Sequence, residues 1–210
     1  MDNAYDNLKN LIDYLHSSYT EIARNWMLGD YPKINIKKFL VSDIDNNEII
    51  YKSIMKYIEL LNDQTPDVVL QFPFICSYVV RSRIKAQNSI EYNIKNYKTA
   101  DHNFGKIPIK KCLNDLFGVR ITLDPPSLDF EQILSFIDET YQGKFRYYDA
   151  SKGDYRAIHL YIKENNKTFP WELQIWNKCD AQKNVKSHMI YKQAYTTWEK
   201  ESKEGGIIND

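Results

Sequence analysis

The sequence has few cysteines and no pattern among them. Cys76, Cys112 and Cys179 are its three cysteines, widely spaced, without a CxxC pair or a nearby set of Cys and His residues. Zinc ligands come in close pairs and disulfide frameworks need an even number of thiols, so neither is expected. An odd number of unpatterned thiols favours the reducing cytoplasm.

Signals for export and membrane insertion are also lacking. The chain begins Met1-Asp2-Asn3 and has neither a basic segment nor an apolar stretch there, so we expect no signal peptide. No apolar run approaches the roughly 18–20 residues that span a bilayer. We therefore expect no association with a membrane.

Net charge is absent, because 28 Lys and Arg residues balance 28 Asp and Glu residues. A non-specific nucleic-acid binder usually has an excess of basic residues, so the zero net charge argues against that class of protein. The charge is unevenly spread, however: residues 81–111 hold 8 basic residues against 2 acidic ones. On charge alone this stretch is either a site for a polyphosphate ligand or a solvated basic helix face.

Glycine-rich phosphate motifs are missing as well. The chain contains no GxxxxGK[ST] segment and no GxGxxG segment, which argues against a P-loop and a dinucleotide-binding fold. Aromatic residues are what the chain has in excess, at 14% with 16 Tyr. Tyrosine suits core edges and base stacking alike, and the first use accounts for most of them.

Apolar periodicity predicts helices first and strands later. Three- and four-residue steps predict amphipathic helices over residues 5–27 and 47–62, with Pro66 beyond the end of the second. Short runs rich in Val, Ile, Tyr and Phe predict strands over residues 76–83, 117–123, 144–148, 155–162 and 168–176. Further helices are predicted over residues 88–97, 109–116 and 180–200, and from Asp129, which is spaced with Gln132 as a capping pair.

This order of elements predicts the fold class. Helices followed by a block of strands and helices indicate an α+β fold with a mixed, largely antiparallel β-sheet flanked by helices and an N-terminal helical segment. The last three strands are joined by short connections, which favours antiparallel pairing among them.

The segment TFPWELQIW, residues 168–176, places an acid and an amide on one face of a strand. Glu172, Gln174 and Trp176 alternate with Leu173 and Ile175. Such a pattern is usually the solvent side of a sheet. The acid is also a candidate for chemistry.

The preceding strand offers a candidate base-binding surface. Tyr155 and His159 share one face, and the turn before them, Ser151-Lys152-Gly153-Asp154, supplies a cation. Core Tyr and His residues are commoner than such a platform.

Two further segments contain candidate metal and phosphate ligands. Asp115 stands at the entrance to the strand 117–123, where it could cap a turn or bind Mg²⁺ together with Glu172 if their strands are neighbours. Arg83, Lys85 and Ser89 span a strand end, a turn and a helix start, a place where phosphate groups bind readily.

The segments RIKAQNSI, DLFGVRI, KGDYRAIHL, WELQIW and SHMIYK, taken in this order, resemble the RelA/SpoT synthetase domain over roughly residues 75–195. The resemblance implies a nucleotidyltransferase-like fold with an N-terminal helical segment (1–70), a synthetase domain (71–200) and a C-terminal tail (201–210). It also implies a cytoplasmic, Mg²⁺-dependent enzyme that moves the β,γ-pyrophosphate of ATP to the 3′-OH of GDP or GTP, which makes (p)ppGpp. No HD-type cluster of His and Asp lies upstream, so we do not expect the hydrolase half of the long family members.

The same resemblance implies roles for individual residues. Arg83 matches the arginine that stacks on the ATP adenine, Lys85 and Ser89 match residues at the ATP phosphates, and Lys95 is an added ATP contact. Asp115 and Glu172 match the two acids of the Mg²⁺ site, and Glu172 matches the base for the acceptor hydroxyl. The acceptor-binding set comprises Lys152, Tyr155, His159 and Gln174. The closing H..YK element is His188, Tyr191 and Lys192, interpreted as mostly structural.

Three positions depart from the family pattern. Asp154 replaces a Gly before the tyrosine, Trp176 replaces an Arg after the acidic strand, and Asn93 replaces a Lys whose loss we expect Lys95 to compensate. These departures keep two alternatives open: a toxin-type member that modifies the 3′ end of tRNA, and an inactive nucleotide-binding module. Expected partners are therefore ATP with GDP or GTP, and alternatively tRNA or a protein antitoxin, with the oligomeric state open.

Overall fold

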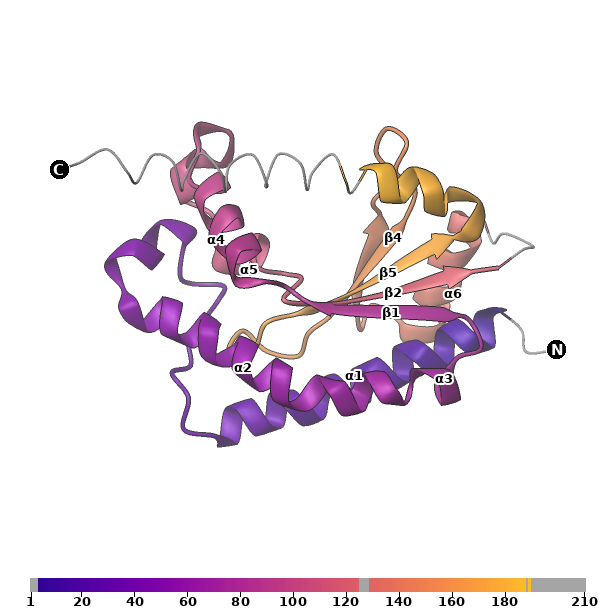
Figure 1. Ribbon diagram of the computed structural model, residues 1–210, viewed down its shortest axis with the longest axis horizontal. Coiled ribbons are helices and arrows are strands. Elements are labelled where there is room, and N and C mark those ends of the chain that lie inside the picture. Colours follow the sequence, from indigo (N-terminus) through magenta and orange to yellow (C-terminus); the bar gives the residue numbers. More distant parts are fainter. Residues whose placement is uncertain (1–3, 125–128, 188, 190–210) are drawn as a thin grey trace.

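The computed structural model describes residues 4–124, 129–187 and 189. It is an α+β structure in which five strands form one sheet in the order β1-β2-β5-β4-β3 (Figure 1). The strands are β1 (Val79–Ile84), β2 (Phe117–Leu123), β3 (Arg146–Asp149), β4 (Ile158–Ile162) and β5 (Trp171–Asn177). The expected fold class, with its mixed sheet flanked by helices, is confirmed.

Strand directions make the sheet mixed. β2 and β5 run parallel, whereas β1·β2, β3·β4 and β4·β5 are antiparallel. The antiparallel pairing predicted for the last three strands is confirmed. β5 lies at the centre, and all seven of its residues are buried.

Helices cover one face of the sheet and one of its ends. α1 (Ala4–Leu28) and α2 (Glu48–Leu70) run side by side beneath the strands, followed by the short α3 (Phe72–Ile75) (Figure 1). α6 (Phe130–Tyr141) joins this layer, since the Tyr141 hydroxyl donates to Asp13 of α1 at 3.0 Å. α4 (Gln87–Asn96) and α5 (Ile109–Cys112) lie at one end of the sheet (Figure 1). Shorter 3₁₀ turns are η1 (Val41–Asn46), η2 (Ala100–Gly105) and η3 (Lys178–Asp180).

The core lies between the sheet and the long helices. Val119, Ile121, Leu173 and Ile175 on the central strands are 2% exposed or less, and they belong to one apolar cluster with the inner stripes of α1 and α2. We call this side of the sheet the apolar face. Burial of this size is the main stabilising contribution to the fold.

The second helix is longer than its sequence suggested. It was expected to end near Asn62 with Pro66 outside, but α2 continues to Leu70 with Pro66 inside. The Thr65 hydroxyl donates to the Leu61 carbonyl at 2.7 Å, and Val68 is buried. The apolar stripe therefore continues past the proline, and tertiary packing outweighs its local cost.

Four strand starts were also predicted too early, including those of β3, which begins at Arg146 rather than at residue 144, and β5, which begins at Trp171 rather than at residue 168. β1 begins at Val79 rather than at residue 76, and β4 begins at Ile158 rather than at Tyr155. Tyr155 belongs to a turn instead, because it exchanges two backbone hydrogen bonds with Lys152. The turn predicted at residues 151–154 is therefore confirmed.

The helix predicted over residues 109–116 is shorter than expected, because α5 ends at Cys112, whereas other helix boundaries agree more closely. Asp129 caps α6 by accepting from the Glu131 N–H at 3.1 Å, and α4 lies within one residue of its expected range. Residues 181–187 are helical, whereas most of the helix predicted to residue 200, with His188, Tyr191 and Lys192, lies outside the described residues. The domain division at residues 70 and 71 stays a prediction. Among the described helices, none is long and apolar enough to cross a membrane.

Candidate active site

Polar side chains cross the other side of the sheet in two rows. Side chains alternate along each strand, so every second residue faces this side and the register brings these residues together. One row runs through Arg83, Gly118, Glu172, Tyr161 and Arg146. The next row runs through Arg81, Arg120, Gln174, His159 and Tyr148. We call this side the polar face.

Asp115 lies just before β2 and binds two cations of the polar face. Its carboxylate is 2.7 Å from Lys85 Nζ and 3.2 Å from the Arg83 guanidinium. Lys85 follows β1, and its backbone N–H donates to the Leu116 carbonyl, which continues the strand ladder. The Lys85 and Asp115 side chains are 9% and 14% exposed, so this ion pair is largely shielded from water. The structure therefore brings three of the expected site residues together.

Glu172 is a buried carboxylate with three donors. Tyr161 Oη, Gln174 Nε2 and His159 Nδ1 lie 2.9, 2.8 and 3.0 Å from its oxygens. Burial by itself would raise the pKa of Glu172, but the hydrogen bond and charge of His159, with the bonds from Gln174 and Tyr161, outweigh it and lower the pKa to about 2. The carboxylate is therefore ionised at neutral pH and is a weak proton acceptor, which favours binding of a cation or orientation of a hydroxyl over strong general-base catalysis.

The expected solvent side of the strand 168–176 is in fact buried. Glu172 and Gln174 are each 6% exposed, and Trp176 is 1% exposed. Interpreting this face as the wet side of a sheet was wrong because β5 is the central strand and its polar side chains hydrogen-bond to neighbouring strands. A buried polar network of this kind limits the positions that its members can adopt.

Tyr155 and His159 connect to this network. The Tyr155 hydroxyl lies 2.9 Å from His159 Nε2, and the ring meets the Trp176 ring edge-on with centroids 6.0 Å apart. Burial is the main cause that raises the pKa of Tyr155 to about 12. Four residues expected in the acid and acceptor sites therefore form one hydrogen-bonded group: Tyr155, His159, Glu172 and Gln174.

The turn that carries Tyr155 is held from two sides. The backbone N–H of Arg156 donates to Asn184 Oδ1 at 2.8 Å, and Asn184 Nδ2 donates to the Arg156 carbonyl at 2.7 Å. Asn184 is fully buried. The Arg156 guanidinium folds back onto the Gly153 and Tyr155 carbonyls. Gly153 has φ +59°, a conformation that glycine adopts without strain. Lys152 is exposed on the same turn, beside the group rather than in it.

Trp176 forms part of the support for this group. The Arg120 guanidinium lies 3.5 Å from the centre of the Trp176 ring and also donates to Gln174 Oε1 at 3.0 Å. Burial first, and nearby arginines, lower the pKa of Arg120 to about 10. The departure at position 176 thus replaces a cation by a ring, and Arg120 stacks on that ring.

Gly118 leaves the polar face open between its two acidic centres. It lies in the register row between Arg83 and Glu172, where any other residue would add a side chain. A Cβ at this position would come within 3.6 Å of Arg83 Nε. Sequence reasoning passed over this glycine, although a glycine inside a strand pattern signals close approach by another group.

The ATP-site residues on α4 are less closely grouped. Ser89 lies in the first turn of α4, and Lys95 is exposed in its last turn. Six positions separate them, which turns Lys95 about 120° around the helix from Ser89. Asn93, four residues after Ser89, shares its side of the helix instead.

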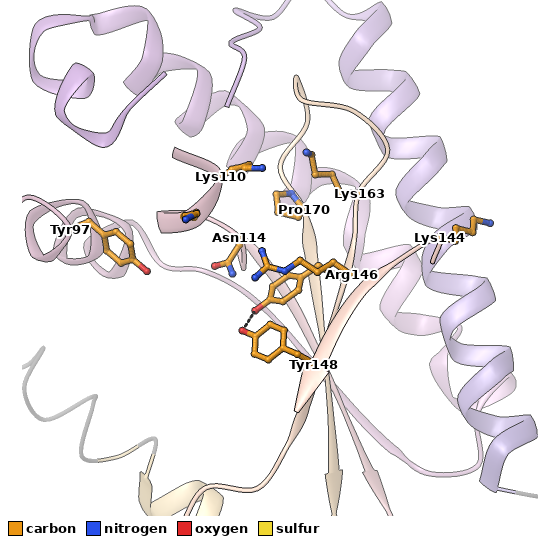
Figure 2. Close-up of a pocket in the computed structure, with 10 residues that line it drawn as sticks. Tyr97, Lys110, Asn114, Lys144, Arg146, Tyr148, Lys163 and Pro170 are labelled. Carbon is orange, nitrogen blue, oxygen red and sulfur yellow. Dashed lines mark hydrogen bonds between the residues drawn. The ribbon is translucent and has the colours of Figure 1, made fainter. Parts of the chain in front are cut away.

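Sequence reasoning missed a basic cavity of about 480 Å³, whose wall includes Tyr161, the hydrogen-bond partner of Glu172 (Figure 2). Five cations line it: Lys110, Lys111, Lys144, Arg146 and Lys163. Tyr97, Tyr148, Tyr161, Asn114 and Pro170 complete its wall, so that none of its lining residues is acidic. The cations come from three separate segments, and only the strand register and the packing of α5 reveal that they converge.

This cavity is electrostatically unbalanced. None of its five cations forms an ion pair with a described carboxylate. Burial first, and then neighbouring lysines, lower the pKa of Lys163. A cluster of this kind attracts an anion, and a polyphosphate would neutralise several cations at once.

The carboxylates fit a metal ion that arrives with a ligand. Among the described residues, no group of three or more His, Cys, Asp or Glu side chains could hold a metal by itself. Asp115 and Glu172 instead offer two carboxylates at the same end of the polar face. Mg²⁺ takes one or two carboxylates and fills its remaining positions with water and phosphate oxygens, so this donor set suits Mg²⁺ bound to a nucleotide.

Comparisons with known proteins place the chain in a family. A family model described as a region found in RelA / SpoT proteins matches residues 82–196, more than half of the chain. A search of curated proteins found no match. Among solved structures, the small alarmone synthetase 1 from Bacillus subtilis is 16% identical, with a TM-score of 0.38 over 77% of this chain and 95% of that one. The small alarmone synthetase 2 of the same organism is 18% identical, with a TM-score of 0.36 over 66% and 77%. Both TM-scores are low, so the assignment rests on the family model: the chain belongs to the family that shares the RelA/SpoT region.

Proposed function

We propose that this protein transfers the β,γ-pyrophosphate of ATP to the 3′-OH of GDP or GTP and so makes (p)ppGpp. The observation that carries the proposal is the order of groups across one face of the sheet. The cations that pair with Asp115 lie on the β1 side, and Glu172 with its hydrogen-bond donors lies in the middle. The basic cavity lies on the β3 side. Such an order suits two phosphorylated ligands that meet at the acids.

The donor nucleotide would bind at the β1 side. Arg83 would stack on its adenine, Lys85 would supply charge for its phosphates, and Ser89 at the start of α4 would supply a hydroxyl and a helix N-terminus. Both cations are paired with Asp115, so the nucleotide would compete with that carboxylate for them. Gly118 adds no side chain between Arg83 and Glu172, and the cavity of about 200 Å³ that it lines would give the phosphate chain room there.

The acceptor would bind at the β3 and β4 side. Tyr155 would stack on the guanine, His159 and Gln174 would line the ribose side, and Lys152 would lie at the rim. The basic cavity would take the 5′-phosphates, because its wall includes Asn114, next to Asp115, and Tyr161, which bonds Glu172. Phosphate charge and reacting hydroxyl would then lie on opposite sides of Tyr161.

Positioning and charge neutralisation dominate pyrophosphate transfer. When bound, Mg²⁺ neutralises charge that develops on the transferred phosphates. Asp115 and Glu172 would hold it, and Glu172, ionised at neutral pH, would orient the acceptor hydroxyl. The reaction would take place in the cytoplasm, where ATP and guanine nucleotides are available and the three free cysteines stay reduced.

An assay of acceptors tests the proposal directly. Radiolabelled ATP and Mg²⁺ are incubated with the protein and with GDP, GTP or bulk tRNA in turn, and labelled product and AMP are measured. We expect label on GDP or GTP with one AMP released per transfer. Label on tRNA alone would show that tRNA is the acceptor. The toxin-type activity, with a protein antitoxin as partner, would then become the working proposal. No AMP with any acceptor would indicate a nucleotide-binding module.

Asp115→Asn supplies the matched variant. It keeps the shape of the side chain and removes the charge that binds Lys85 and the metal, so transfer should fall on the order of 10²–10⁴-fold. Asp101→Asn, an exposed acid in η2, is the control and should leave the rate unchanged. Near-normal turnover of the Asp115 variant would contradict the assignment.

A further inference from the structure

Tyr161 is the residue where the basic cavity and the Glu172 network meet. It lies on β4, opposite Glu172 of β5 and opposite Arg146 of β3. Its ring lines the cavity, and its hydroxyl donates to Glu172 Oε1 at 2.9 Å. The side chain is buried, with 8% of the residue exposed. One side chain therefore forms the wall between a site for phosphate charge and a catalytic carboxylate.

A second tyrosine supports it. The Tyr148 hydroxyl lies 3.3 Å from the Tyr161 hydroxyl, a contact drawn as a dashed line in Figure 2, and the two rings stack with an angle of 22° between them. The Arg146 guanidinium lies 5.6 Å from the Tyr148 ring centre and 5.9 Å from the Tyr161 ring centre. The hydroxyl of Tyr161 is thus fixed by its ring packing as well as by its hydrogen bonds.

Glu172 needs this donor to hold its orientation. Oε2 accepts from Gln174, while Oε1 is shared by Tyr161 and His159. Loss of the tyrosine hydroxyl removes one of two donors from Oε1, and the remaining one is an imidazole whose ring also contacts Tyr155. A buried carboxylate that loses a donor turns toward other partners, because an unsatisfied charged oxygen is costly.

We propose that Tyr161 is a positioning residue for the transfer reaction: its hydroxyl orients the Glu172 carboxylate toward the acceptor hydroxyl, and its ring separates that carboxylate from the acceptor's 5′-phosphates. Tyr148 holds Tyr161 in turn. The inference rests on the proposed function for its catalytic consequence, whereas its structural consequence, the orientation of Glu172, is independent of it.

The kinetic experiment compares single-hydroxyl deletions. Tyr161→Phe keeps the ring and should lower kcat about 10–100-fold with the KM of ATP and acceptor within about twofold of their original values. Tyr148→Phe, one step further away, should lower kcat by about threefold. Tyr161→Ala also removes the wall and should raise the acceptor KM as well.

The matched control is Tyr147→Phe. Tyr147 is the neighbour of Tyr148 on β3, faces the opposite side of the sheet and donates to Asp138 of α6 at 2.8 Å. Its variant loses one tyrosine hydroxyl bond without touching the polar face, so kcat should not change. A kcat of Tyr161→Phe within twofold of the unaltered protein, or a fall equal to that of Tyr147→Phe, would overturn the proposal.

A crystal structure of the Tyr161→Phe variant tests the position of Glu172 without requiring that the protein be active. We expect the Glu172 carboxylate to rotate away from its position between His159 and Gln174. An unchanged carboxylate would overturn the inference even in an active enzyme. If the unaltered protein transfers nothing to any acceptor while Glu172 rotates as expected, the proposed function fails and the positioning of Glu172 by Tyr161 stands.

Discussion

The two faces of the sheet differ completely although they are built from the same strands. On β5, Leu173 lies in the apolar core against the long helices, whereas its neighbour Glu172 lies in the hydrogen-bonded network of the polar face. The same alternation holds on β4, where Leu160 faces the core between His159 and Tyr161. Core packing and the proposed chemistry therefore involve adjacent residues, and substitutions on one strand can separate their effects.

The largest expected effect is on the polar face. Glu172→Gln keeps the volume of the side chain and removes its charge, so pyrophosphate transfer should fall on the order of 10²–10⁴-fold. AMP release under saturating ATP and acceptor measures the loss, and circular dichroism checks that the fold persists. Turnover close to that of the unaltered protein would remove Glu172 from the site.

The neighbouring residue should give the opposite result. Leu173→Ala leaves a cavity in the core and should lower the free energy of unfolding by about 2–5 kcal/mol. Urea denaturation measures this, and the rate per folded molecule at low temperature should stay near its original value. If Leu173→Ala lost activity while remaining folded, the two faces would not be as independent as the packing indicates.

Acid should weaken the polar face through Glu172. Its pKa is about 2 in the folded protein and near 4.5 when unfolded, so folding favours the ionised form. The stabilisation is present above pH 4.5 and is lost as the pH falls toward 2, by about 3 kcal/mol at most. The Tm of Glu172→Gln should accordingly fall less steeply than that of the unaltered protein over this range. Parallel Tm curves would contradict the low pKa.

The smallest expected effect concerns the turn that carries Tyr155. Asn184→Ala leaves the Arg156 N–H and C=O without partners and should cost about 1–3 kcal/mol of stability. Because the turn is then less well held, the acceptor KM should rise more than the KM of ATP. Gln182→Ala, at an exposed position of the same helical segment, is the control. Equal changes in both KM values would argue against a link between Asn184 and the acceptor.

Local sequence signals predicted the elements whose local and tertiary preferences agree. β2 was located to the residue, and the cap at Asp129 was identified because it depends on spacing alone. The end of α2 could not be predicted from Pro66, because the core packing that carries the helix past the proline is non-local. Tyr155 was placed in a strand because its alternation with His159 continues through a turn that only backbone pairing defines.

The candidate site was predictable in its residue types and not in its surroundings. Neighbouring strands bring the expected residues together in two pairs, Asp115 with Lys85 and Glu172 with His159. The basic cavity was missed because Lys110, Arg146 and Lys163 are far apart in sequence, and the basic stretch 81–111 contributes only two of its five cations. A prediction of the register between β3, β4 and β5 would have been needed to find it.

The position of β5 has a consequence for how the molecule is made. β5 is the last of the five strands along the chain, yet it lies in the middle of the sheet, between β2 and β4. A nascent chain that ends before Trp171 has two unpaired strand edges and no Glu172, so it can neither close its sheet nor assemble its acids. Pairing of β2 with β5 spans more than fifty residues, so closing this loop costs more conformational entropy than pairing strands that are adjacent in the chain. The polar face is therefore complete only when this final strand enters the sheet.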